Sequence, residues 1–106
     1  MSKRKWNKAN YFARKKSTPR KVGHPVYVYG RSGRYRKYLT ITHKPEKGKE
    51  TDYEELKHNI DPNEDGKRPN YLKKKFGVSP DTSLHPPDKK YRIHADDKDT
   101  FERYKK

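Results

Sequence analysis

Only 14 of the 106 residues are Leu, Ile, Val or Phe, while 41% of the residues are charged. Such a chain lies near the border of disorder, because folding must bury enough apolar surface to offset the lost chain entropy. Nine Tyr and one Trp add aromatic surface that disordered chains usually lack. The sequence therefore predicts one small α+β domain with a limited core, and leaves a largely disordered basic protein as the alternative.

The positive charge is concentrated towards the N-terminus. The first 44 residues hold 14 Lys or Arg and no Asp or Glu, so they carry +14 of the formal net charge of +15. Like charges held together repel, and a polyanionic partner that releases counterions on binding is the usual compensation. We therefore expect a nucleic-acid partner, with an acidic protein surface as an alternative. The expected phosphate contacts of this segment are Lys3, Arg4, Lys5, Arg14, Lys15, Lys16, Arg20 and Lys21.

The chain divides into an arm and a domain. Residues 1–21 read as a basic flexible arm that orders on a partner, and residues 22–106 as a small α+β domain. Thr51 to Ile60 has capping-box and helical spacing, which predicts a short helix there. Residues from about 63 to 90 are rich in Pro, Gly, Asn and Asp and predict a long irregular segment with a short strand near Tyr71. A last helix is expected to start at Asp96 or Asp97, with Phe101 and Tyr104 buried.

Residues 26–29 and 35–43 are rich in β-branched and aromatic residues and predict an antiparallel hairpin. A two- or four-residue loop places the apolar residues on one face and leaves the other aromatic and cationic. Exposed tyrosines offer surfaces on which bases stack, and neighbouring arginines contact phosphate. The alternative is that these tyrosines pack inside the fold. The predicted core face holds Val26, Val28, Tyr35, Lys37, Leu39 and Ile41. The predicted nucleic-acid face and turn hold Tyr27, Tyr29, Arg31, Arg34, Arg36 and Tyr38, together with Thr40 and Thr42.

Several classes of site are not indicated. There is no Cys, and the five histidines match no common zinc spacing, so we expect no metal and no cofactor. No run of about 18 apolar residues predicts a membrane span, and the basic start lacks the apolar core of a secretory signal. We expect a cytoplasmic protein that does not associate with membranes. The sequence does not indicate the oligomeric state.

One segment resembles a known family. Gly23-His24-Pro25-Val26, followed by a strand and then Thr40-Ile41-Thr42-His43, resembles the PemK/MazF-type toxin ribonucleases over about 20 residues. The resemblance implies a small SH3-like antiparallel barrel that cleaves single-stranded RNA without metal, with Thr42 at the position of the family's hydroxyl residue. The catalytic Arg that precedes the Pro in that family is replaced here by His24.

Metal-independent RNA cleavage needs a base for the 2′-OH, an acid for the leaving oxygen and a cation for the phosphorane. The candidate catalytic residues are His24, Arg36, Thr42 and His43. Because His24 stands where the family has Arg, we expect binding without cleavage. The predicted function is thus a small nucleic-acid-binding protein that favours RNA over DNA. A metal-independent endoribonuclease is the alternative.

Overall fold

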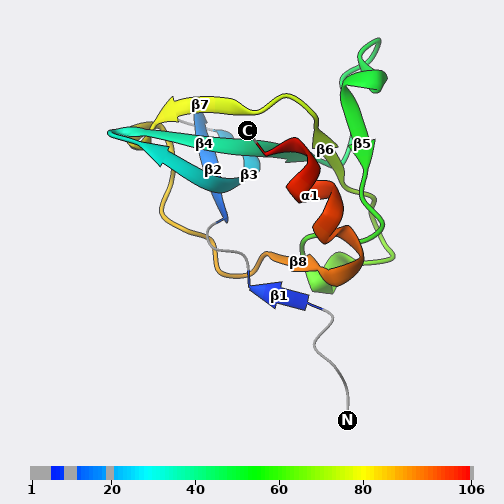
Figure 1. Ribbon diagram of the computed structural model, residues 1–106. Coiled ribbons are helices and arrows are strands. Elements are labelled where there is room, and N and C mark those ends of the chain that lie inside the picture. The colour runs from blue at the N-terminus through cyan, green and yellow to red at the C-terminus, as the bar shows by residue number, and fades with distance from the viewer. Residues whose placement is uncertain (1–5, 9–11, 19–20, 106) are drawn as a thin grey trace.

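The hairpin is the longest paired unit in the computed structural model of this protein, which describes residues 6–8, 12–18 and 21–105 (Figure 1). Its strands are β3 (Lys21–Ser32) and β4 (Tyr35–Thr42). They turn at Gly33 and Arg34, where Gly33 adopts a φ of +61° that favours glycine. The predicted strands are therefore present, with a two-residue turn.

A β-bulge changes which residues share a face of the hairpin. Near the turn Gly30 pairs with Lys37, but farther along Val28 pairs with Tyr38, so Tyr29 is an extra residue in β3. One extra residue exchanges the two faces of a strand beyond the bulge. Val26 and Val28 consequently share a face with Tyr38. The predicted face assignment was wrong for this part of the hairpin.

The remaining strands extend the hairpin on both sides. The main sheet has the order β2-β3-β4-β6-β5, and β7 pairs with the half of β4 that β6 leaves unpaired. All of these pairs are antiparallel. β1 and β8 form a separate antiparallel pair. The bounds are β1 (Trp6–Lys8), β2 (Phe12–Thr18), β5 (Tyr53–Glu55), β6 (Tyr71–Lys73), β7 (Gly77–Pro80) and β8 (Arg92–His94).

Two apolar clusters lie on opposite faces of the hairpin. The smaller cluster consists of Ala13, Val26, Val28, Tyr38 and Leu84. The segment after β7 passes along the outer edge of β2, where the backbone N–H groups of residues 85 and 88 donate to the carbonyls of residues 14 and 12 at 2.8 and 2.7 Å. This cluster is therefore enclosed by β2, β3, β4, β7 and the segment 84–88. The larger cluster consists of Phe12, Tyr27, Leu39, Ile41, Leu56, Ile60, Leu72, Tyr91, Ile93 and Phe101.

The described part of the expected flexible arm lies in strands. Phe12 and Ala13 of β2 are 2% and 0% exposed, and each belongs to one of the two clusters. The flexible arm was predicted from the run of positive charges along the chain. In the structure Asp88, which is distant in sequence, lies 4.0 Å from Arg14 and offsets part of that charge. The rest of the arm, residues 1–5, 9–11 and 19–20, lies outside the described residues.

The C-terminal helix is confirmed, and the helix expected after Thr51 is wrong. α1 spans Lys98–Tyr104 and buries Phe101, with Tyr104 packed at the edge of the core. Residues 50–52 form the short 3-10 helix η1, and Tyr53 to Glu55 then pair with β6. Three further 3-10 turns are η2 (Pro62–Glu64), η3 (Asp81–Ser83) and η4 (Ala95–Asp97). The protein is thus an α+β fold with an antiparallel sheet and one short C-terminal α-helix. No helix of the described ranges is long and apolar enough to span a membrane.

Candidate nucleic-acid site

A cavity of ≈ 540 Å³ opens where β2, β3 and β4 meet the segment 59–70 and Tyr91. Three of the four residues predicted as catalytic line it: His24 of β3, Thr42 at the end of β4 and His43 directly after it. The residues of this cavity that bear on its chemistry are Arg14, His24, Thr42, His43, Asp61, Glu64, Arg68, Lys90 and Tyr91. We call it the histidine cavity.

Arg14 is held in place at the wall of the histidine cavity. Its guanidinium donates to the backbone carbonyl of Gly23 at 3.3 Å and to the hydroxyl of Tyr91. Asp88 lies 4.0 Å from its Nε, and about a third of the Arg14 side chain is exposed. A fixed guanidinium that stays accessible is suited to a phosphate group, because its planar donors match two phosphate oxygens.

His24 and His43 lie close enough to influence each other electrostatically. Partial burial, followed by the positive charges of His43, Arg14 and Lys15, lowers the pKa of His24. A lowered pKa leaves the His24 imidazole neutral at pH 7, so it can accept a proton. The histidine cavity therefore brings a neutral imidazole, a second imidazole and a guanidinium together.

Thr42 has a structural role in the hydrogen bonding of the strand end. It is only 7% exposed, its hydroxyl donates to the carbonyl of Lys44 at 3.1 Å, and the Lys44 N–H donates back at 3.3 Å. Both bonds close a local turn after β4. The hydroxyl that the family resemblance placed at the site is thus already paired.

Two buried asparagines shape the loop that carries Arg68. The side-chain amide of Asn59 donates to the Arg68 carbonyl at 3.0 Å, and its carbonyl accepts the Asp61 N–H at 2.8 Å. The side chain of Asn70 accepts the Ile60 N–H at 2.8 Å. Buried amides that both donate and accept in this way fix the loop geometry. They place the Asp61 and Arg68 side chains at the rim of the histidine cavity.

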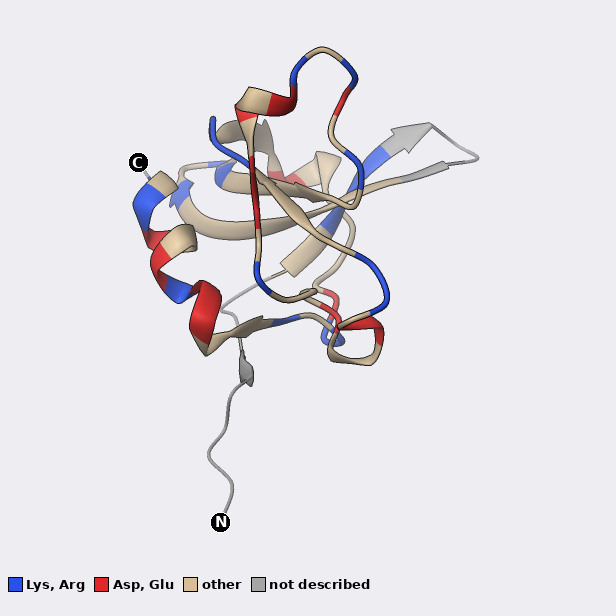
Figure 2. Cartoon of the chain, turned by 90° about the vertical axis from the view of Figure 1, so that its right-hand side faces the viewer, with Lys and Arg blue, Asp and Glu red and all other residues tan. Residues whose placement is uncertain are grey.

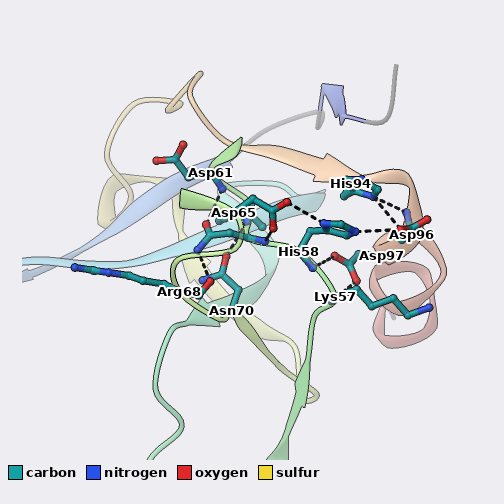
Figure 3. A network of polar contacts seen from close by, with 11 residues as sticks. Lys57, His58, Asp61, Asp65, Arg68, Asn70, His94, Asp96 and Asp97 are labelled. Atoms are coloured by element: carbon teal, nitrogen blue, oxygen red, sulfur yellow. Dashed lines mark hydrogen bonds and ion pairs between the residues drawn. The ribbon is translucent and has the colours of Figure 1, made fainter. Parts of the chain in front are cut away.

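A network centred on His58 braces the same loop from its other side (Figure 3). His58 Nδ1 is 3.0 Å from Asp65, its Nε2 is 3.0 Å from Asp96, and its ring stacks on His94 with centroids 3.5 Å apart. Ionised carboxylates only accept hydrogen bonds, so both His58 nitrogens must donate and the ring is an imidazolium. The Asp97 carboxylate also accepts the backbone N–H groups of residues 57 and 58, and the Asp65 carboxylate accepts that of residue 59.

The pKa values of this network follow from its contacts. Burial lowers the pKa of His58, but the hydrogen bonds to Asp65 and Asp96 and the charges of Asp65 and Asp97 outweigh it, so the pKa is raised. For Asp65, burial raises the pKa, but the hydrogen bonds from His58 and from the Asn59 backbone outweigh it and lower the pKa. The hydrogen bond from His58 is also the main cause that lowers the pKa of Asp96.

His58, His94 and Asp96 also form a group whose potential metal-ligand atoms lie within 4.8 Å of one another. The two imidazole planes are inclined by only 12° and stacked at 3.5 Å. A metal bound in the plane of one ring at about 2.1 Å would lie far from the plane of the other. His94 Nδ1 moreover accepts the Asp96 N–H at 3.0 Å. The arrangement fits a hydrogen-bonded imidazolium and not a metal centre.

No protein-family model matches this chain, and comparisons with curated proteins and with solved structures give no significant match. The resemblance to the PemK/MazF-type ribonucleases and the SH3-like barrel therefore stay predictions.

The predicted stacking face is largely interior. Tyr27 and Tyr38 are each 4% exposed, so neither offers a ring to a base. Tyr29 is half-buried against the larger cluster, and the ammonium of Lys105 lies 5.9 Å from its ring centroid. The physical reason is the bulge, which turns Tyr38 inward to meet Val28. The alternative interpretation, packing of the tyrosines, is the one that the fold realises.

The predicted cations are dispersed over the molecule. Arg36 lies at the turn end of β4, 3.5 Å from Asp81, and does not line the histidine cavity. Lys15 is half-buried with its ammonium 5.2 Å from the Tyr38 ring centroid, and Lys16 is exposed. Arg31 and Arg34 are exposed at the turn. Lys3, Arg4, Lys5 and Arg20 lie outside the described residues, as does the side chain of Lys21.

The cavity residues that sequence reasoning did not single out are Asp61, Glu64, Arg68, Lys90 and Tyr91. Glu64, Arg68 and Lys90 lie in the segment read as irregular, and Asp61 and Tyr91 flank it. Its Asn, Asp, Pro and Gly residues are the ordinary composition of turns, which carries no chemical signal of its own.

Proposed function

We propose that this protein binds single-stranded RNA, with one phosphodiester of the strand in the histidine cavity. The observation that carries the proposal is that three cations from separate segments, Arg14, Arg68 and Lys90, line one cavity with two histidines. Cationic groups around an accessible cavity focus the field and favour a phosphate there. Asp61 and Glu64 line the same cavity and reduce its net positive charge. Their carboxylates can accept hydrogen bonds from a base or a sugar.

Single-stranded RNA suits this cavity better than a duplex. A cavity of ≈ 540 Å³ admits a nucleotide-sized group, whereas a double helix would have to stay outside it. The only α-helix among the described residues has seven residues, which gives no recognisable major-groove reader. The imidazole of His24 can accept a hydrogen bond from a 2′-OH, the group that distinguishes RNA from DNA.

Binding can be tested with matched cation variants. Arg68→Ala is expected to weaken binding of single-stranded RNA and to lower the slope of log affinity against log salt by about 0.7 per lost phosphate contact. Lys98→Ala removes the same charge from the exposed surface of α1 and serves as the control. Equal losses in both variants would contradict the cavity as the binding site. Absence of RNA binding at low salt would contradict RNA as the partner and favour an acidic protein surface.

Cleavage of the bound strand is the second candidate function. From the sequence we expected binding without cleavage, because His24 occupies the place of an Arg. The observation that favours cleavage is that Arg14 of β2 lines the same cavity as His24 and His43, so a guanidinium lies near both imidazoles. These three groups have the chemical types that RNA transphosphorylation requires.

The step can be written with all atoms balanced. Neutral His24 takes the proton of the 2′-OH, and the 2′-oxygen forms a bond to phosphorus. Arg14 stabilises the charge of the phosphorane, and the bond from phosphorus to the 5′-oxygen breaks. Protonated His43 gives its proton to that oxygen. The products are a 2′,3′-cyclic phosphate and a 5′-hydroxyl, and no metal or other reactant is consumed.

The test is cleavage of single-stranded RNA in EDTA as a function of pH. Because the pKa of His24 is lowered, the acidic limb of a bell-shaped profile is expected below about pH 6.5. His24→Ala and His43→Ala should each lower the cleavage rate by about 10²-fold or more and leave RNA binding intact. Intact RNA at every pH, together with normal binding, would leave the protein as a binder alone.

A further inference from the structure

The turn end of the hairpin carries a second cationic and aromatic surface, which we call the tip patch: Arg31, Arg34, Tyr35 and Val78. Tyr35 and Val78 are the large hydrophobic residues that are most exposed in the described ranges, at 51% each. Tyr35 is fixed between Ser32 of β3 and Pro80 of β7, so its backbone is held by two neighbours. Figure 1 shows this turn projecting at one end of the sheet, away from α1.

The charge of this end is positive and only partly compensated. Residues 30–38 and 77–83 contain four basic side chains and one carboxylate, Asp81, which pairs with Arg36 at 3.5 Å. Nη1 of Arg36 is buried without a hydrogen-bond acceptor among the described residues. Figure 2 shows that acidic residues lie on other parts of the chain, among them β5, the start of α1 and several loops. An exposed aromatic ring at the same turn as two exposed guanidinium groups, which form no ion pair among the described residues, is complementary to a nucleotide, which presents a base and a phosphate together.

We propose that the tip patch is a second contact for the same RNA strand, with a base stacked on Tyr35 and phosphates at Arg31 and Arg34. The inference rests on the proposed function, because the strand that reaches the tip is the one held in the histidine cavity. Val78 supplies apolar surface next to the stacked base. The tip thereby takes the stacking role that Tyr27 and Tyr38, both buried, cannot take.

The length of β4 sets the span between the two contacts. Tyr35 begins β4 at the tip and Thr42 ends it at the histidine cavity, which corresponds to about 24 Å at roughly 3.4 Å per residue. A stacked strand that rises about 3.4 Å per nucleotide covers this span with roughly seven nucleotides. An oligonucleotide of about four nucleotides can occupy only one contact, whereas one of about twelve can occupy both and gain from the linkage.

The test compares two RNA lengths in native protein and in tip variants. Tyr35→Ala is expected to raise the Kd for a uridine oligonucleotide of about twelve nucleotides by roughly 5- to 150-fold. Tyr35→Phe keeps the aromatic ring and should bind this RNA like the native protein. An oligonucleotide of about four nucleotides, held in the histidine cavity, should bind Tyr35→Ala and native protein equally. Arg34→Ala should lower the salt slope for the longer RNA only.

The outcomes separate this inference from the proposed function. If native protein binds the longer RNA and Tyr35→Ala binds it equally well, the tip patch is not an RNA contact and the inference is overturned, while the histidine cavity stands. A loss of affinity for both lengths would also overturn it, because the two contacts would not be separate. If native protein binds neither RNA, the proposed function itself fails. Thermal melting of Tyr35→Ala, an exposed position, checks that the variant is folded.

Discussion

At the scale of single residues, the protonation of His58 depends on contacts that the fold brings together. Its two ring nitrogens face Asp65 and Asp96 at 3.0 Å each, and its ring covers His94. Because the folded state raises the pKa of His58 above its unfolded value, the network stabilises the fold fully at pH below about 6.5. This contribution is lost as the pH rises through the folded-state pKa. The lowered pKa of Asp65 has the opposite consequence, since its contribution is lost as the pH falls through the folded-state value.

We therefore predict that His58→Gln destabilises the protein more at pH 6 than at pH 9. Glutamine keeps hydrogen-bonding capacity but not the positive charge, so we expect a loss of about 1 kcal/mol at the lower pH. Urea denaturation at both pH values measures the difference, and His85→Gln, outside the network, is the control. A loss that is the same at both pH values would mean that His58 is neutral in the folded protein.

At the scale of elements, the bulge in β3 decides which tyrosines are structural. Tyr38 and Tyr35 belong to the same strand, but Tyr38 is 4% exposed and Tyr35 is 51% exposed. Tyr38 also donates or accepts a hydrogen bond with Ser79 at 2.8 Å. Its ring passes over Gly77 of β7, where an added Cβ would lie 2.6 Å from the ring. Glycine at position 77 is therefore required by this close approach.

The pair of tyrosines gives a matched stability test. Tyr38→Ala is expected to cost about 3–5 kcal/mol, because it empties the centre of the smaller cluster. Tyr35→Ala is expected to change the free energy of unfolding by less than about 0.5 kcal/mol. Chemical denaturation of both variants measures these values. Comparable losses at the two positions would place Tyr38 at the surface and would contradict the bulged register.

At the scale of the whole molecule, β2 of the N-terminal segment is part of the fold and of the site. β2 contributes Phe12 to one cluster, Ala13 to the other and Arg14 to the histidine cavity. The positive charge of Arg14 is offset by Asp88, and its guanidinium also donates to the Tyr91 hydroxyl; both partners are distant in the chain. The described basic residues of β2, which look like part of a free tail in the sequence, thus lie in a strand of the main sheet.

Two truncations distinguish tail from domain. Deleting residues 1–5, which hold Lys3, Arg4 and Lys5, should lower the salt dependence of RNA binding. Deleting residues 1–21 should unfold the protein, because both clusters lose a buried residue and the sheet loses β2. RNA binding across a salt series measures the first result, and circular dichroism melting measures the second. A stable fold after the longer deletion would show that β2 is dispensable and would support the prediction of a flexible arm over residues 1–21.

The sequence by itself determined three of the local elements, the hairpin strands and the C-terminal helix, since these depend on residues that are neighbours in the chain. β-branched and aromatic runs specified β3 and β4, and the charge order and apolar spacing after Asp97 specified α1. The capping-box pattern at Thr51 was misleading because pairing of Tyr53 to Glu55 with β6 outweighed a weak helical preference.

Only the tertiary structure decided how these elements are oriented and what meets at the site. The bulge at Tyr29 could not be read from composition, because one unpaired residue exchanges the faces of a strand without changing its sequence pattern. The sequence singled out His24 and His43, and the antiparallel pairing of β3 with β4 brings His24 of β3 near His43, which follows β4. Arg14 and Arg68 reach the same cavity through long-range contacts, Arg14 with the Tyr91 hydroxyl and the Arg68 loop through the buried Asn59 side chain. Such contacts depend on the packing of segments far apart in the chain, which no local pattern encodes.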